Sequence, residues 1–146
     1  MEMRLEKRNG FTISGYLIET VATDDSYAVK SLALREKYGA VLKMNATIRY
    51  GATWFTNDGN LYYLFGVEQV NEMLVGDNNI IIPKGLFAVA TVPVDMPLMH
   101  AWNVMWETGL PSIGYNYIEG EKCFERFGEN NVREIWVPVV KSEEKN

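Results

Sequence analysis

The order of the expected elements constrains the fold of this chain most, because the series strand, helix, strand, strand occurs twice. Residues 4–20 alternate between apolar and polar positions as a strand does, with a break expected near Gly10. Helix-capping residues follow at Asp24–Ser26, and Gly39 is the expected end of the helix. The apolar positions at helical spacing between them are Ala28, Val29, Leu32 and Ala33.

Two strands joined by a tight turn complete the first unit. Thr47–Thr56 and Leu61–Gln69 are rich in β-branched and aromatic residues, which favour strands. Asn57–Asn60 separates them, and its Asp-Gly pair supplies the positive φ angles that a hairpin turn needs. The first unit is therefore expected to end in an antiparallel hairpin.

The second half repeats this order. Asn79–Val92 is expected to form a strand that is interrupted at Pro83–Gly85. Glu121–Gly128 and Arg133–Lys141 form a second pair of expected strands, joined at Glu129–Asn131.

A helix lies between these strands. Asp95 can cap it, and Pro97 then falls in its first turn, where a missing N–H costs nothing. Gly109 and Pro111 are expected to end it. Its apolar stripe consists of Leu98, Met99, Trp102, Met105 and Trp106.

These elements predict an α+β fold in which two pseudo-symmetric β-α-β-β repeats, residues 1–72 and 73–146, form a single domain. The repeats pair into one curved antiparallel sheet that carries two helices on one face. A central pocket is expected between the helices, because ligand pockets commonly form between packed elements.

The charge of the chain argues against one class of function. The net charge is −5 and the Lys and Arg residues are scattered, whereas a nucleic-acid site needs them clustered. We therefore expect no direct nucleic-acid binding. An acidic chain weakly favours a cationic ligand.

The single cysteine, Cys123, and the single histidine, His100, set further limits. One cysteine forms no internal disulfide, and one Cys with one His makes no standard zinc site. No metal or other cofactor is expected. No apolar run approaches the ~20 residues of a membrane span and no signal peptide is evident, so the prediction is a cytoplasmic protein without membrane contact.

The second half resembles the effector-binding domain of bacterial multidrug-responsive transcription regulators, the GyrI-like or AraC-type effector-binding family. The matching segments are Ile82–Ala90, Ala101–Trp106, Cys123–Phe127 and Glu134–Val139, with a weaker match at Tyr62–Glu68 in the first half. The resemblance implies two strand–helix–strand–strand units with a hydrophobic pocket between them that binds lipophilic cations. The chain looks like the stand-alone form of such a domain, similar to an integron cassette protein.

The resemblance also implies site residues. It places Glu125 in the pocket, facing the positive charge of the ligand, and it places Glu134 and Trp136 at the pocket border. Strand alternation puts Cys123, Glu125 and Phe127 on one face, and Glu134 and Trp136 share a face of the last strand.

Other readings of these residues stay open. Glu125 could instead be an exposed strand residue paired with Arg126, and Glu134 a solvated carboxylate at a strand edge. Trp102 and Trp106 fit the core and the pocket equally. The alignment of the two halves favours Tyr62 over Tyr63 for the pocket.

The chemistry of such a site suits a delocalised cation. Burial of a lone carboxylate costs several kcal/mol and tends to raise its pKa. A bound cation offsets that cost, and aromatic faces add roughly 0.5–2 kcal/mol each. The resulting specificity is expected to be loose, because only one charge is held.

The main expectation is therefore a non-enzymatic binding module for a small lipophilic cation, acting in transcription regulation through a protein partner that supplies DNA binding. One alternative is a small-molecule hydrolase in which Glu125 activates water. Another is a protein-interaction module of the gyrase-inhibitor kind.

Overall fold

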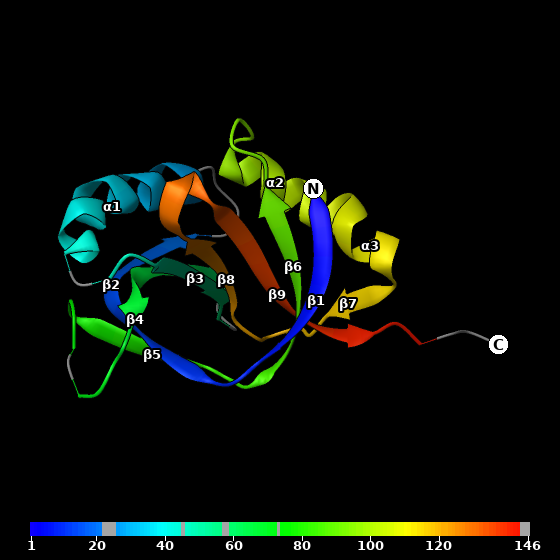
Figure 1. The fold of residues 1–146 in the computed structure, drawn as a ribbon, viewed down its shortest axis with the longest axis horizontal. Helices are drawn as coiled ribbons and strands as arrows, with labels where there is room; N and C mark the ends of the chain where they lie inside the picture. The colour runs from blue at the N-terminus through cyan, green and yellow to red at the C-terminus, as the bar shows by residue number, and fades with distance from the viewer. Residues whose placement is uncertain (22–25, 45, 57–58, 73, 144–146) are drawn as a thin grey trace.

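The computed structural model describes residues 1–21, 26–44, 46–56, 59–72 and 74–143. The fold is α+β, with a curved antiparallel sheet and helices gathered along one side of it (Figure 1). The expected residues Asp24, Asp25, Asn57 and Asp58 lie outside the described ranges.

The elements follow the predicted order. The first unit consists of β1 (Glu2–Arg8), β2 (Phe11–Val21), α1 (Ser26–Lys43), β3 (Arg49–Phe55) and β4 (Asn60–Glu68). The second consists of β5 (Asn78–Ile82), β6 (Gly85–Val92), α2 (Leu98–Val104), a π-helix (Met105–Gly109), α3 (Leu110–Ile113), β7 (Tyr115–Tyr117), β8 (Cys123–Phe127) and β9 (Arg133–Lys141).

The two units join edge to edge in one sheet. The strand order is β1-β6-β9-β8-β3-β4-β2-β5, and the short strand β7 pairs with β9. In the middle of the sheet, β3 of the first unit pairs with β8 of the second. At its two ends, β1 of the first unit pairs with β6 of the second, and β5 of the second pairs with β2 of the first. The predicted α+β fold with a curved antiparallel sheet is confirmed. The strand β7 was not predicted.

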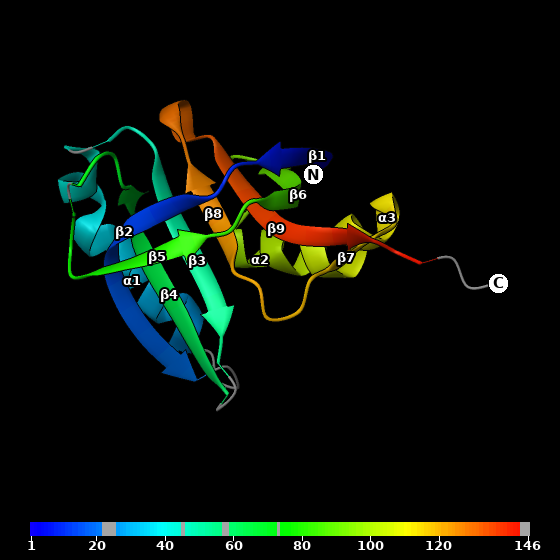
Figure 2. The same ribbon diagram turned by 90° about the horizontal axis from the view of Figure 1, so that it is seen from below.

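Both long expected strands bend where the sequence suggested a break. β1 and β2 are separated at Asn9–Gly10, and β5 and β6 are separated at Pro83–Lys84. β1 then pairs with β6 and β2 pairs with β5, so the two bent strands run beside each other on both sides of the bend (Figure 2). A Cβ at Gly10 would lie 3.2 Å from the Ile82 carbonyl oxygen, so the bend keeps the two strands close.

The apolar core lies on both faces of the sheet. One cluster, around Trp102 and Met105, lies between the α2 segment and the second unit, and another, around Leu34 and Tyr63, lies between α1 and the first unit. A third cluster contains Phe124 and no helical residue, and it is enclosed by the bent strands on the other face. The sheet is thus buried on two sides, which suits its long apolar runs.

Helix α1 departs from its sequence prediction in length and in orientation. It continues through Gly39 to Lys43, because the fully buried Leu42 holds its last turn to the sheet. The predicted apolar positions Val29 and Leu32 are 69% and 49% exposed. Tertiary packing therefore overrode the local pattern.

The second helix also continues past its predicted end. Gly109 and Pro111 lie inside a run that changes from α to π and back to α, and Gly114 ends it with a φ of 72°. The N-cap of α2 is Pro97 and not Asp95. Within the described ranges, no helix is long and apolar enough to cross a membrane.

Candidate functional site

Glu125 occupies the middle of β8 and is 2% exposed. It pairs with Gly51 of β3 and Ile135 of β9, so it lies near the junction of the two units. Its side chain meets residues of both α1 and α2, which places it on the helical face between the two helix-covered clusters.

Both carboxylate oxygens of Glu125 accept a hydrogen bond. The Tyr63 hydroxyl donates to Oε1 at 2.7 Å, and the Trp102 indole Nε1 donates to Oε2 at 2.7 Å. The guanidinium Nη1 of Arg35 lies 3.8 Å from Oε1. These groups come from β4, α2 and α1, so the site depends on the assembly of the whole domain.

Burial dominates the electrostatics of this carboxylate. Loss of solvent raises the pKa of Glu125 above its usual value, although the charge of Arg35 and the hydrogen bonds from Trp102 and Tyr63 oppose that rise. Burial, followed by the Glu125 charge, also raises the pKa of Tyr63 well above 10. Tyr63 therefore stays a neutral donor at physiological pH.

Arg35 supplies the positive charge nearest to Glu125. Its side chain is 18% exposed, and its Nη1 also donates to the Tyr63 hydroxyl at 3.2 Å. Its guanidinium carbon lies 5.7 Å from the centre of the Tyr63 ring and 5.9 Å from that of Phe127. These are distances at which a cation is attracted to an aromatic face.

Arg35 and Tyr63 were not predicted as site residues. Ser31, Leu34, Arg35 and Leu42 are spaced as one helical face, and that spacing was the signal for an inward-facing arginine. This spacing was overlooked because Val29 and Leu32, which are exposed, gave a stronger apolar pattern on the outer face of the helix.

A pair of tryptophans extends the site toward the surface. The Trp102 and Trp106 rings are stacked with centres 5.9 Å apart, and Trp106 is 41% exposed. Trp106 also meets the edge of Tyr117 at 5.4 Å. It lies in the π-helical segment, a distortion that often marks functional sites.

Tyr63, and not the expected Tyr62, contacts Glu125. Tyr62 stacks on Trp54 at 5.6 Å. Successive residues of a strand point to opposite faces, so the two tyrosines cannot both reach Glu125. Tyr62 was aligned with Glu134, and both residues lie on the face of the sheet away from Glu125.

Trp136 and Glu134 do not share a site with Glu125. In the pairing of β8 with β9, Trp136 lies opposite Phe124 and Glu134 opposite Arg126, which places both on the other face. The Trp136 ring stacks on Phe124 at 5.3 Å in the cluster enclosed by strands. The expectation that they border the Glu125 site is corrected by this register.

Glu134 already has cationic partners on its own face. Its carboxylate lies 2.5 Å from Nη2 of Arg4 and 3.3 Å from Nη1 of Arg126. The indole Nε1 of Trp136 donates to it at 3.3 Å. Glu134 is thus a buried, paired carboxylate that stabilises β9 against its neighbours.

Phe127 lies on the same face as Glu125, two residues further along β8. Its ring meets Phe65 at 5.9 Å and lies under the Arg35 guanidinium. The structure therefore brings together four of the expected residues, Glu125, Trp102, Trp106 and Phe127, and adds Tyr63 and Arg35.

Neither a reactive thiol nor a metal-ligand cluster is found at this site among the described residues. Cys123 is 4% exposed, and burial raises the pKa of its thiol to about 12. In the described part of the chain, no group of three His, Cys, Asp or Glu residues could hold a metal ion.

No family model and no curated protein matches this chain in sequence. Solved structures nevertheless share its fold. The structure of SAV2435 bound to tetraphenylphosphonium has a TM-score of 0.75 and 16% identity, over 96% of this chain and 94% of that chain. The integron cassette protein VCH_CASS2 from the mobile metagenome of Vibrio cholerae has a TM-score of 0.71 and 19% identity, over 94% and 95%.

A more distant structure is that of a hydrolase from Listeria innocua. It has a TM-score of 0.54 and 12% identity, over 95% of this chain and 92% of that chain. At these identities the similarity concerns the fold alone. The resemblance seen in the sequence is confirmed at that level: this chain has a GyrI-like effector-binding fold.

Proposed function

We propose that this protein binds a lipophilic, delocalised cation at Glu125. The observation that carries the proposal is the buried Glu125 carboxylate, which two helices and three donor side chains surround. A carboxylate with a raised pKa in such surroundings gains from a second positive charge. SAV2435, which has the same fold, is bound to such a cation, tetraphenylphosphonium.

The ligand competes with Arg35 in this proposal. The Arg35 guanidinium lies beside Glu125 and near the Tyr63 and Phe127 rings, which is the environment that a ligand cation would need. Arg35 is 18% exposed at the side chain and can turn toward solvent with its helix in place. A phosphonium or quaternary ammonium group then replaces it against the carboxylate, and its apolar substituents contact the rings.

Trp106 provides the first contact for the ligand. Its ring is partly exposed and stacks on Trp102, whose indole nitrogen holds Glu125. An aromatic cation that stacks on Trp106 is therefore guided toward the carboxylate by a continuous aromatic surface.

The test uses two probes of the same shape and opposite charge, tetraphenylphosphonium and tetraphenylborate. Tryptophan fluorescence should report saturable binding of the phosphonium and much weaker binding of the borate. Glu125→Gln should reduce phosphonium affinity by about tenfold or more, because a charge-assisted interaction is lost. Glu134→Gln, which removes an equal charge on the other face, should leave that affinity unchanged.

The proposal fails if both probes bind equally, or if Glu125→Gln binds the phosphonium as well as the native protein does. Circular dichroism of each variant separates a loss of binding from a loss of fold.

A hydrolase is the second candidate, because a carboxyl group with a raised pKa is also suited to act as a general base. A hydrolase with this fold is known. Turnover of a neutral ester that disappears in Glu125→Gln would support this candidate. Cation binding without turnover would support the binding module.

A protein partner that supplies DNA binding remains a prediction. Co-purification of a DNA-binding protein whose association changes with tetraphenylphosphonium would support it. A ligand-independent association would favour the interaction module instead.

A further inference from the structure

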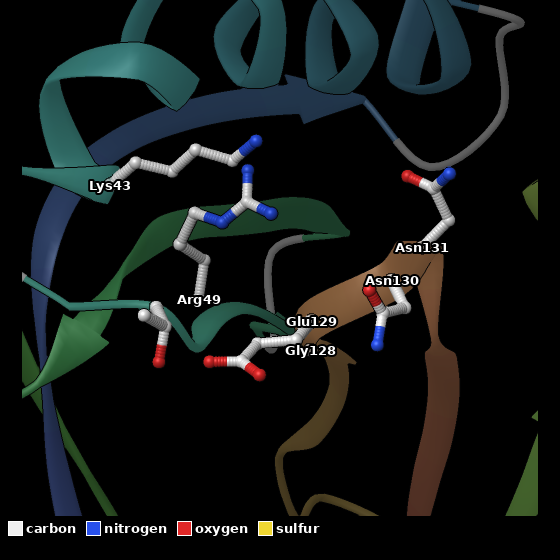
Figure 3. A pocket seen from close by; sticks show the side chains of 7 residues that line it. Lys43, Arg49, Gly128, Glu129, Asn130 and Asn131 are labelled. Carbon is white, nitrogen blue, oxygen red and sulfur yellow. The ribbon is translucent and has the colours of Figure 1, made fainter.

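A pocket lies at the C-terminal end of α1, away from the hydrogen-bonded partners of Glu125. It has a volume of about 380 Å³ and is lined by Lys43, Thr47, Arg49 and the turn Gly128–Asn131. In the view of Figure 3 the charged ends of Lys43 and Arg49 lie near each other, and the Asn131 carboxamide turns its oxygen toward them. The Glu129 carboxylate points away from these two groups.

Among the described residues no acceptor is found for Arg49, although the buried Nε of Arg8 also forms no hydrogen bond. The Nε of Arg49 is buried and forms no hydrogen bond, and no ion pair joins Arg49 or Lys43 to a described carboxylate. The remaining arginines all have partners. Arg4, Arg8, Arg35 and Arg126 contact carboxylates, and Arg133 donates to backbone carbonyls.

This isolation has an energetic consequence. Burial without an opposing partner lowers the pKa of Arg49, whereas the pKa values of Arg4 and Arg35, which have carboxylate partners, are raised. A guanidinium that loses solvent without gaining an acceptor costs free energy. An anion in the pocket would supply the acceptor, and the planar guanidinium suits two-oxygen groups.

The surrounding groups fit an oxyanion. Lys43 adds a second positive charge, and the Thr47 hydroxyl and the Asn130 and Asn131 carboxamides add neutral donors. Asn130 and Asn131 have φ values of 58° and 60°, a left-handed conformation that forms the turn at the pocket wall. A second hollow of about 290 Å³ shares Arg49, Gly128 and Asn131, so the space continues beyond the first pocket.

We propose that this Lys43–Arg49 pocket is a second ligand site that binds an oxyanion, a carboxylate or phosphate group of a small molecule. The pocket shares no lining residue with the Glu125 site, and the adjoining hollow reaches that site only at Phe127. On an acidic chain with a net charge of −5, it would give the protein local affinity for a class of ligand that its overall charge disfavours.

The experiment is a titration of the isotope-labelled full chain, followed by the backbone amide signals of Gly128, Asn130 and Asn131. Inorganic phosphate and acetate are added separately, and sodium chloride at equal ionic strength serves as the reference. The variants are Arg49→Gln and Lys43→Gln. Lys30→Gln is the matched control, because Lys30 is an exposed lysine on the same helix and does not line the pocket.

Saturable shifts with phosphate, acetate or both, beyond those with chloride, support the site and identify which oxyanion it prefers. Arg49→Gln should weaken that binding about tenfold or more, and Lys43→Gln about two- to fivefold. Lys30→Gln should bind as the native protein does. If Arg49→Gln fails to fold, the oxyanion affinity of Lys43→Gln decides whether the pocket is the binding site.

The proposal is overturned if phosphate and acetate act only as chloride does, or if Lys43→Gln and Lys30→Gln have the same effect. Lys43 and Arg49 would then only stabilise the C-terminal end of α1 through their interaction with the helix dipole. Because the titration contains no cationic ligand, neither result bears on Glu125.

Discussion

The hydroxyl of Tyr63 donates a 2.7 Å hydrogen bond to Oε1 of Glu125 across the strand that separates them. Tyr63 belongs to β4, Glu125 belongs to β8, and β3 lies between them. The residue of β3 that pairs with Glu125 is Gly51. A Cβ at that position would clash with the Tyr63 hydroxyl and lie 2.7 Å from Glu125 Oε1, so the contact requires glycine.

Gly51→Ala is therefore expected to disrupt the site. Tyr63 is fully buried, so its ring has no free space to enter, and we expect unfolding free energy to fall by about 2–4 kcal/mol. Urea denaturation measures the change. Gly85→Ala is the control, because a Cβ there has no neighbour within 4 Å, and it should change stability by less than about 1 kcal/mol. Equal losses in the two variants would contradict the steric argument.

Arg35→Gln tests whether Arg35 competes with the ligand. Removal of the resident cation should increase tetraphenylphosphonium affinity by about three- to tenfold. The affinity should be measured at pH 8 or above. The Arg35 charge lowers the pKa of Glu125, so removal of that charge favours the protonated form of Glu125.

The variant Lys30→Gln, which replaces an exposed lysine of the same helix, is the control for the change in net charge. An Arg35→Gln variant with unchanged or weaker affinity at high pH, while Glu125→Gln still abolishes binding, would refute competition by Arg35 and leave the Glu125 site standing.

Cation binding should depend on pH through Glu125. Because burial raises its pKa, the carboxyl group takes up a proton at higher pH than an ordinary glutamate, and the neutral acid attracts a cation less. Tetraphenylphosphonium affinity should therefore fall with decreasing pH below the raised pKa, by up to about tenfold per pH unit. Affinity measured between pH 4.5 and pH 8 should decline in the native protein and stay flat in Glu125→Gln.

Protein stability should show the opposite dependence. The folded state holds the Glu125 proton more tightly than the unfolded state, whose glutamate pKa is ~4.3. The contribution of Glu125 to stability is thus present at low pH and is lost as the pH rises through the raised pKa. A saturating cation should offset that loss, so the ligand-induced increase in Tm should grow with pH over the same interval. A constant increase would contradict the coupling.

Cys123 is expected to resist alkylation in the native protein. Its thiol is 4% exposed and its pKa is about 12, so both access and thiolate content are low at pH 8. Mass spectrometry after iodoacetamide treatment should find little modification, and much more in urea. Rapid alkylation of the folded protein would show that β8 opens readily.

The candidate site was only partly predictable. Glu125 and Phe127 followed from alternation along one strand together with the family resemblance, and Trp102 from a helical stripe. Tyr63 was missed because Tyr62 was aligned with Glu134, which was expected in the pocket but lies with Tyr62 on the other face of the sheet. Trp136 was misplaced for a related reason, since alternation relates residues within one strand and leaves the register between β8 and β9 open.

The order of the elements, the two bends in the long strands and the α+β class could be predicted from the chain, because alternation, turn residues and glycine or proline breaks act locally. Which groups meet Glu125 depends on long-range packing. Arg35, Tyr63 and Trp102 come from three separate elements, and their approach depends on the pairing of β3 with β4 and β8 and on which face α1 turns inward. Those choices are made by burial summed over the whole domain, which no local pattern contains.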